Sequence, residues 1–223
     1  MRFSEIHERA IARKGGVEEL NARLPTPPPP ASELEQRSDD RYLAEMTCCV
    51  FKAGFVWRVI DKKWPDFEAA FHGFVPAYWQ QVPPDVLEAL ACDERIVRNL
   101  QKIRTVPENA RMIMDTVHEH GSFGAFLRQW PSSDQAGLLL WFKRHGSRLG
   151  GNGAQYFLRR VGWDGFIMSN DVIQVLRHAK LLDASTSSKK GLYQVQEAFN
   201  AWHEETGLPY SQLSRIASYS IDG

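Results

Sequence analysis

The sequence predicts an all-α protein, and three observations support this fold class. Apolar residues recur every three or four positions, which is the spacing of one buried helix face; an example is the stretch with Tyr42, Leu43, Met46, Cys49 and Val50. No run alternates convincingly between apolar and polar residues, as a half-buried strand does. Most breaks between the apolar stretches coincide with Gly, Pro or an Asp/Ser helix start, where helices usually begin or end.

The length and composition limit the class of protein. A chain of 223 residues can form one sizeable domain, or one core divided into two lobes. Lys plus Arg and Asp plus Glu number 27 each, so the net charge of the whole chain indicates neither a nucleic-acid nor a membrane partner. No run approaches the roughly 18 apolar residues that a membrane span needs, and the charged N-terminus lacks a signal core. We therefore expect a cytoplasmic monomer that binds no membrane.

The N-terminal residues 1–32 are expected to form an arm. Two short helices precede the segment Leu24–Ser32, which contains four consecutive prolines. Such a run cannot be helical and adopts an extended polyproline II conformation. We therefore predict a proline-rich strap that ends near residue 32, followed by a single helical domain over 33–223.

The helices of that domain are predicted from their caps and apolar spacing. Ser38 begins the first helix, and a second apolar segment continues to Pro65. Further helices are expected at about 66–72, 84–91, 93–101, 106–119 and 122–129. The C-terminal part, about 186–220, is predicted to form one long and one short helix that clamp the bundle.

The region of about 134–162 is predicted to form two helices joined by a glycine-rich hairpin. The turn GSRLGGNG, Gly146 to Gly153, has four glycines in eight residues, which allows positive φ angles and a close approach of the backbone to a ligand. Between Trp141 and Lys180, seven Lys and Arg residues stand against two acids, a local excess of five positive charges. Exposed backbone N–H groups at a helix N-terminus, flanked by cations, can hold a phosphate. A helix connection without a ligand is the alternative interpretation.

Two patterns, in the expected order, resemble a known family of DNA repair enzymes over roughly residues 38–182. Leu149-Gly150-Gly151-Asn152-Gly153 resembles the L-P-G-V-G hairpin of the helix–hairpin–helix DNA glycosylases, and SNDVIQVLRHAKLL is similar to the D-x-H-V-x-R-v stretch of that superfamily. The second pattern is similar to DNA-3-methyladenine glycosylase I. It consists of Ala53–Trp57 (AG-x-x-W), Phe71–Phe74 (F-x-x-F) and Ile96–Ala110, which ends in N-A.

The resemblance implies a two-lobed helix–hairpin–helix glycosylase fold and a function in base excision repair of damaged double-stranded DNA. The implied reaction is hydrolysis of the N-glycosidic bond of an alkylated purine, with 3-methyladenine as the expected base and no cofactor. Asp171 stands at the position that resembles the catalytic aspartate of the superfamily. Trp57 would form an aromatic wall that holds a cationic base by stacking and cation–π attraction, with Trp163 as a weaker candidate. Cys49 and Lys52 would also line the base pocket.

The resemblance also places the DNA contact at the hairpin. The expected DNA-binding residues are Lys143, Arg148, Gly150, Gly151, Gly153 and Gln155. Gln155 stands where bifunctional members of the superfamily have a lysine that forms a Schiff base. Because an amide cannot attack an aldehyde carbon, we expect no associated lyase activity.

The sequence departs from the family in ways that leave alternatives open. Cys49 occupies the position of the family's base-recognising glutamate, and Glu45 lies one helical turn earlier. The cysteines and histidines that bind zinc in the family are absent, so we expect no metal. A non-catalytic protein that binds DNA lesions, or a small all-α interaction protein, would also fit. Asp171 could be only a helix N-cap, and Trp57 could be only a core residue.

Overall fold

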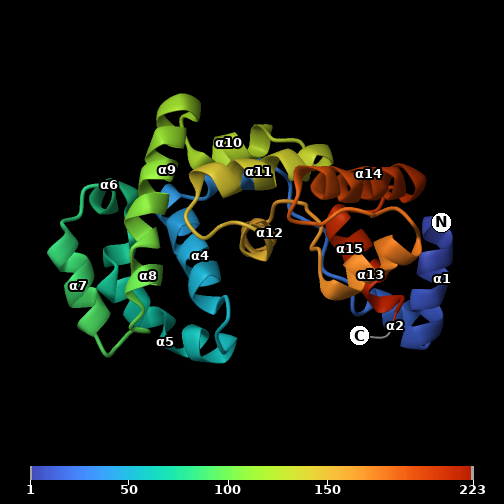
Figure 1. Cartoon of the computed structure of the whole chain (residues 1–223), viewed down its shortest axis with the longest axis horizontal. Helices are drawn as coiled ribbons and strands as arrows, with labels where there is room; N and C mark the ends of the chain where they lie inside the picture. The colour runs from blue at the N-terminus through green and yellow to red at the C-terminus, as the bar shows by residue number, and fades with distance from the viewer. Residues whose placement is uncertain (1, 222–223) are drawn as a thin grey trace. The chain divides into compact units, whose positions relative to one another are not determined.

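The computed structural model describes residues 2–221, and all regular elements within this range are helical, which confirms the predicted all-α class (Figure 1). The chain forms two compact units. Unit 1 contains Pro131–Leu140 together with residues 2–29 and 162–221, and unit 2 contains Pro30–Trp130 and Trp141–Val161. Among residues 2–221, no helix is both long and apolar enough to cross a bilayer.

Unit 1 contains the N-terminal and the C-terminal segments of the described chain. Glu205 of α14 accepts a hydrogen bond at 2.9 Å from the backbone N–H of Phe3, at the start of α1. Helix α1 also packs on α15. The helices of unit 1 are α1 (Phe3–Lys14), α2 (Val17–Asn21), α13 (Asn170–His178), α14 (Lys189–Thr206), α15 (Tyr210–Tyr219), and the 3-10 turn η2 (Ser132–Asp134). The predicted strap boundary near residue 32 stays a prediction.

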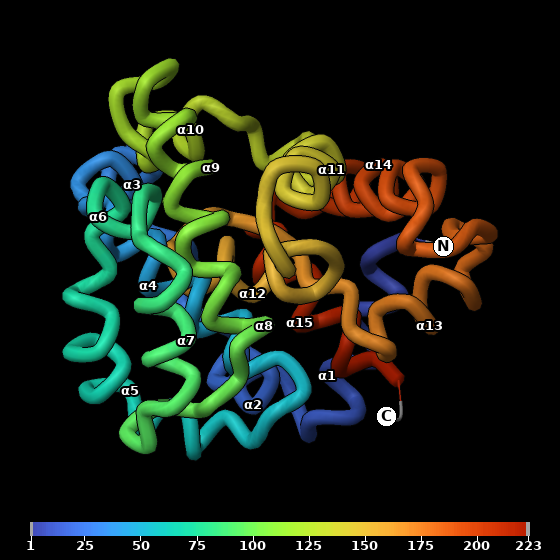
Figure 2. Tube along the Cα trace, turned by 60° about the vertical axis from the view of Figure 1, so that its left-hand side comes forward, coloured from blue at the N-terminus to red at the C-terminus, as the bar shows by residue number. Residues whose placement is uncertain are grey.

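Unit 2 carries most of the shorter helices. They are α3 (Ser32–Gln36), α4 (Asp39–Lys52), α5 (Trp57–Ala70), the 3-10 turn η1 (His72–Phe74), α6 (Pro76–Trp79), α7 (Pro84–Cys92), α8 (Leu100–Ile103), α9 (Thr105–His120), α10 (Phe123–Gln129) and α12 (Asn152–Val161). Helix α11 (Gln135–His145) begins in unit 1 and ends in unit 2. Helix α6 lies beside α9 (Figure 2).

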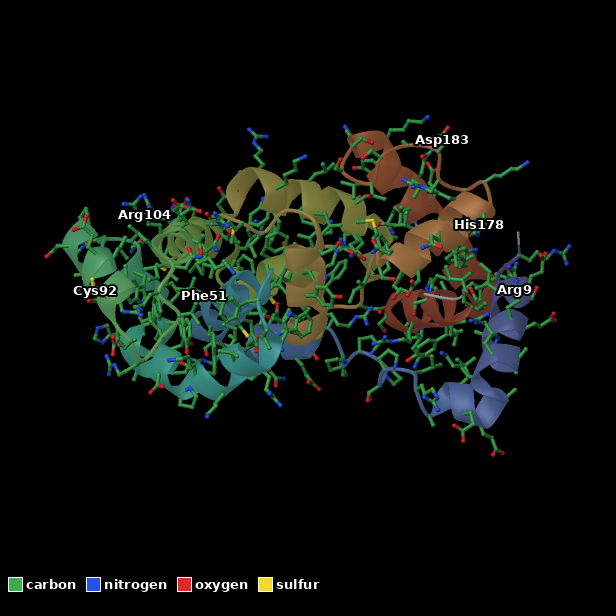
Figure 3. The ribbon with its side chains drawn as sticks, turned by 60° about the horizontal axis from the view of Figure 1, so that its bottom comes forward. Arg9, Phe51, Cys92, Arg104, His178 and Asp183 are labelled. Carbon is green, nitrogen blue, oxygen red and sulfur yellow. The ribbon has the colours of Figure 1, made fainter. Side chains whose placement is uncertain are left out.

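The core of unit 2 is built around α4, which is buried over most of its length. Helix α4 packs against α9 and α12. The ring of Tyr42 meets the rings of Phe123 and Phe157 edge-on, and its hydroxyl donates a hydrogen bond at 2.6 Å to the Leu34 carbonyl. Figure 3 shows Phe51 among the helices of this unit, whereas Cys92 lies at the surface. This packing places the C-terminal end of α4 next to α12.

Two predicted helix boundaries are wrong, each for a local reason. Helix α5 continues through Pro65, although the sequence predicts a break there. The aromatic rings of Trp64, Phe67 and Phe71 stack along this helix and hold it against the core. The predicted helix over 93–101 forms only from Leu100 onward. The Asp93 carboxylate instead accepts a backbone hydrogen bond two residues on, which is turn chemistry that competes with a helix.

Candidate functional site

A cavity of about 360 Å³ lies in unit 2, where the end of α4, the start of α5 and the start of α12 meet. It is lined by Cys49, Lys52, Ala53, Gly54, Trp57, Asn152, Gly153, Tyr156 and Arg160. The cavity brings together three of the predicted substrate-binding residues and one glycine of the predicted hairpin. Its size lies within the usual range for a small-molecule site.

Trp57 forms an aromatic wall of this cavity. It is the first residue of α5, and 51% of its surface is exposed, so it is not a core side chain. Its ring meets the Tyr156 ring edge-on, with 5.5 Å between the ring centroids and 87° between the planes. Tyr156 is not among the residues that the sequence predicts for the site. Its spacing from Gly153 and Arg160 on one face of α12 is the signal that could have indicated it.

Two cations line the cavity, and the acid that pairs with each lies outside the lining. The Lys52 side chain is buried, with its Nζ atom 2.5 Å from Oδ1 of Asp61 and 5.5 Å from the Trp57 ring centroid. Arg160 Nε lies 2.5 Å from Oε2 of Glu45. The Lys52 ammonium is therefore held at the cavity and does not extend into open water.

Cys49 contributes a neutral group to the cavity. Its side chain is buried at the end of α4, and burial raises the pKa of its thiol to about 12. The thiol is therefore protonated at neutral pH and supplies no negative charge. The nearest acid along the helix, Glu45, is held by Arg160. Cys49, which the resemblance places at the position of a glutamate, is thus uncharged.

The hairpin turn lies between the end of α11 at His145 and the start of α12 at Asn152. A Cβ atom at Gly150 or Gly151 would meet no other atom within 4 Å, so the turn is open on that side. Gly151 has a φ of 62°, in the left-handed region that favours glycine. Lys143 and Arg148 lie on either side of Gly146. The open backbone and the two cations form a surface that suits a phosphate strand.

Gln155 braces this turn from inside. Its side chain is buried, and its Nε2 atom donates hydrogen bonds at 3.2 Å to the Gly151 carbonyl and to Oδ1 of Asn152. The resemblance predicts that Gln155 contacts DNA. In the structure its amide is engaged in hydrogen bonds within the turn. Gly153, another predicted DNA-binding residue, lines the cavity.

A buried asparagine, which the sequence reasoning did not single out, fixes the other end of the turn. Oδ1 of Asn109 accepts a hydrogen bond at 2.7 Å from the backbone N–H of Ser147, and its Nδ2 donates one at 3.2 Å to the Ser147 carbonyl. This two-point clamp ties α9 to the first residues of the turn. The next residue, Arg148, adopts a φ of 55°. The sequence signal that could have indicated this asparagine is Asn109-Ala110, which ends the Ile96–Ala110 pattern.

The remaining two predicted site residues belong to unit 1. Trp163 is buried there and does not line the cavity. Asp171 lies in the first turn of α13 and is half-buried. The N-cap of that helix is Ser169, whose hydroxyl oxygen accepts a hydrogen bond from the Val172 N–H. Within residues 2–221 the Asp171 carboxylate has no hydrogen-bond or ion-pair partner, so capping does not account for this residue.

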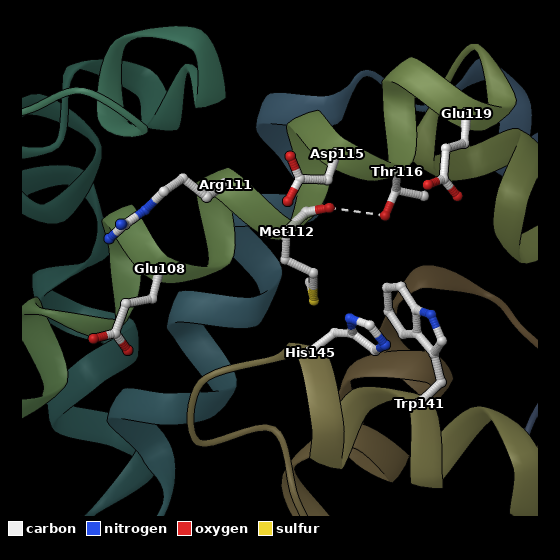
Figure 4. Close-up of a pocket in the computed structure, with 8 residues that line it drawn as sticks. All are labelled: Glu108, Arg111, Met112, Asp115, Thr116, Glu119, Trp141 and His145. Carbon is white, nitrogen blue, oxygen red and sulfur yellow. Dashed lines mark hydrogen bonds between the residues drawn. The ribbon is translucent and has the colours of Figure 1, made fainter.

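A second cavity of unit 2, of about 450 Å³, lies between α9 and the end of α11 (Figure 4). Its lining includes Glu108, Asp115 and Glu119, and the rings of Trp141 and His145 stack beside it. It contains none of the predicted site residues. These three acids stand against one cation, Arg111, and a net negative charge disfavours a nearby DNA backbone, so the first cavity is the candidate site. The described residues 2–221 contain no group of His, Cys, Asp and Glu side chains that could hold a metal ion, and the expected lack of a metal or cofactor stays a prediction.

Comparisons with known proteins agree with the sequence patterns. Residues 34–137 match a family model described as methyladenine glycosylase. The structure is similar to 3-methyladenine DNA glycosylase I from Staphylococcus aureus, with 21% identity over 56% of this chain and 77% of that chain, and a TM-score of 0.50. It is also similar to an 8-oxoguanine glycosylase/lyase from Methanocaldococcus jannaschii, solved with a DNA 15mer, with 15% identity over 97% of this chain and 89% of that chain, and a TM-score of 0.48. The family match and the Staphylococcus aureus structure confirm the predicted resemblance and fold.

The Asn109 clamp leads to a testable prediction. Replacing Asn109 by Ala leaves the backbone N–H and carbonyl of Ser147 without these partners. We expect the free energy of unfolding to fall by about 1–3 kcal/mol, as for other unsatisfied polar groups. Urea denaturation measures this decrease, and amide hydrogen exchange should be faster in residues 146–151.

The matched control is Gln101→Ala, which removes only an exposed hydrogen bond to Arg148. We expect this surface variant to change the stability by less than about 0.5 kcal/mol. Equal urea midpoints for Asn109→Ala and the unaltered protein would show that the clamp does not hold the turn.

Proposed function

We propose, from the premise that this chain is a helix–hairpin–helix protein related to the methyladenine glycosylases, that it removes methylated adenine from damaged double-stranded DNA in base excision repair. The reaction is hydrolysis of the N-glycosidic bond, with 3-methyladenine as the base. One observation carries the proposal: the hairpin and the cavity share a wall, because Asn152 and Gly153 begin the second hairpin helix and also line the cavity.

The shared wall suits an enzyme that acts on a base outside the duplex. A stacked base hides its glycosidic bond, so the nucleotide must rotate out of the helix before it can react. A strand held by its phosphates at the hairpin would place an extruded base close to the cavity. Stacking on Trp57 would then hold the base, with Tyr156 against the edge of that ring. A damaged base costs less to extrude than an intact pair, which favours lesions.

The hairpin supports binding that does not depend on DNA sequence. The open turn at Gly150 and Gly151 leaves backbone N–H groups accessible, and the dipole of α12 favours an anion at its N-terminus. Lys143 and Arg148 add positive charge. Interactions of this kind position a duplex without reading its bases.

Asp171 is the proposed catalytic residue. As the base departs, positive charge develops on the sugar, and a nearby carboxylate stabilises it and can orient the attacking water. An acid with this role needs a carboxylate that is not already neutralised. The lack of a partner for Asp171 within residues 2–221, and the capping of α13 by Ser169, support the assignment.

We also propose that the enzyme is monofunctional, and that it acts as a cytoplasmic monomer without a cofactor. A lyase needs an uncharged amine that can attack the sugar aldehyde. Gln155 offers only an amide that is engaged under the turn. Lys52, the one lysine in the cavity lining among the described residues, is held in an ion pair with Asp61.

Removal of the Asp171 carboxylate should abolish base release. For Asp171→Asn we expect the single-turnover rate of 3-methyladenine release from methylated duplex DNA to fall by about a hundredfold or more, because the developing sugar charge is no longer stabilised. Duplex affinity should stay unchanged. Release is measured by chromatography of the freed base, and affinity is measured by fluorescence anisotropy.

Asp183→Asn is the control, since it removes another acid of unit 1 that is exposed and pairs with Lys190. Equal release by Asp171→Asn and Asp183→Asn would remove Asp171 from the mechanism. Duplex binding by the unaltered protein, without release of any methylated purine, would identify a non-catalytic lesion-binding protein.

The hairpin cations should set the salt dependence of DNA binding. Replacing Lys143 or Arg148 by Ala should weaken binding to all duplex sequences. The slope of log K against log salt should become shallower by about 0.9 for each phosphate that the protein no longer neutralises. Titrations at several salt concentrations test this. The exposed Lys189 of unit 1 provides the control variant, Lys189→Ala. If neither hairpin substitution changes the slope, DNA binds elsewhere on the protein.

The absence of lyase activity is tested with a duplex that contains one abasic site. Borohydride reduces a Schiff base to a stable bond, so a lyase becomes covalently attached to the DNA. We expect no attached protein and no strand cleavage, because Gln155 offers an amide at the position where the resemblance implies the amine of a lyase. Attachment that disappears in Lys52→Met would contradict the proposal and identify Lys52 as the nucleophile.

A further inference from the structure

The charges around the cavity differ from those expected of a site that selects only cationic bases. Such a site gains from an acid in its lining, whereas the lining here includes Lys52 and Arg160 and, among the described residues, no Asp or Glu. Cys49 is a protonated thiol at neutral pH because burial raises the pKa of that group. An entering base therefore meets the positive ends of two ion pairs.

Lys52 is the cation placed to touch a base stacked on Trp57. Only 6% of the Lys52 surface is exposed, and its Nζ lies 5.5 Å from the centroid of the Trp57 ring. The pairing with Asp61 takes one N–H of the ammonium group, which has three. The same group already occupies a cation–π position on the ring. A cationic base gains less from Trp57 than it would from an unoccupied ring.

A cation in this position suits the departure of a neutral base. A cationic alkylated purine leaves as a neutral molecule and needs little help. A neutral purine leaves with the electron pair of the broken C1′–N9 bond, so negative charge develops on the base. A donor that hydrogen-bonds to the base, or transfers its proton to it, stabilises that charge. Water adds to C1′, and the proton that the water loses restores the donor.

We propose that Lys52 is a catalytic residue that stabilises the leaving base and extends the substrates of this site to alkylated purines without net charge. The proposal rests on the glycosylase function proposed above and deepens it by naming a second substrate class. The ammonium group donates to a ring or exocyclic nitrogen of the base while Trp57 stacks on it. Asp61 keeps the ammonium in place from outside the lining.

The test compares one neutral and one cationic lesion in the full-length protein. The neutral probe is 1,N6-ethenoadenine at one position of a duplex, and the cationic probe is 3-methyladenine in methylated duplex DNA. Single-turnover release is measured for the unaltered protein and for Lys52→Met, Lys52→Arg and Lys62→Met. Methionine keeps the approximate length of the side chain without its charge, arginine keeps the charge, and Lys62 is a lysine of α5 outside the cavity lining.

We expect the unaltered protein to release both bases. Lys52→Met should lower release of ethenoadenine by about a hundredfold, the usual effect of removing a donor to developing charge, and this decrease should exceed any decrease in release of 3-methyladenine by at least about tenfold. Lys52→Arg should retain most of the ethenoadenine activity, and Lys62→Met should retain all of it. A helical circular dichroism spectrum and a thermal unfolding midpoint close to those of the unaltered protein show that Lys52→Met is folded.

The outcomes separate this inference from the proposed function. Release of 3-methyladenine without ethenoadenine by the unaltered protein overturns the inference and leaves the proposed function intact. An equal decrease of both activities in Lys52→Met assigns Lys52 a structural role and also overturns it. Release of ethenoadenine alone, abolished in Lys52→Met, supports the inference and contradicts 3-methyladenine as the base. If the unaltered protein releases neither base, both proposals fail.

Discussion

The burial of α4 is the constraint on which the candidate site depends. Its buried residues lie around most of the helix, so its apolar surface can be buried only between other helices. Helices α9 and α12 pack on it. Because α12 is the second helix of the hairpin, this packing joins the turn and the cavity in one unit. Asn109 of α9 then fixes the turn from the opposite side. The geometry of the site thus follows from how one helix is enclosed.

The electrostatics of the cavity follow from where the acids lie. Glu45 and Asp61 each neutralise a cation of the lining without entering the lining themselves. Each pair therefore presents its positive end to the interior, although the pair carries no net charge. Cys49 at the end of α4 is neutral, so it adds no negative charge to the lining that would offset these two cations. The net charge of the whole chain is zero, so it does not reveal this local arrangement. The acids that balance the two cations lie outside the cavity lining.

The sequence was sufficient for the fold class, the hairpin and half of the cavity, because these depend on local patterns. The apolar spacing around Tyr42 predicts a helix, and the glycines after His145 predict a turn. Neither prediction needs tertiary information. The clamp by Asn109 was not predictable, since it joins residues 38 positions apart through a backbone contact. The burial of Lys52 depends on Asp61 in the next helix, and the continuation of α5 through Pro65 depends on stacked aromatic rings. The first two depend on contacts between separate helices, and the third depends on ring stacking that apolar spacing alone does not predict.

The division of the chain has a consequence for dissecting the protein. The polypeptide passes from one unit to the other four times, after residues 29, 130, 140 and 161, and α11 contributes to both. Unit 1 therefore corresponds to no continuous fragment, and the shortest fragment that contains all of unit 2, residues 30–161, also carries Pro131–Leu140 of unit 1. Truncation from either end removes part of unit 1, and a cut within residues 30–161 followed by separation of the pieces divides unit 2. Each unit also has to gather segments far apart along the chain, which slows folding and makes it a property of the whole polypeptide.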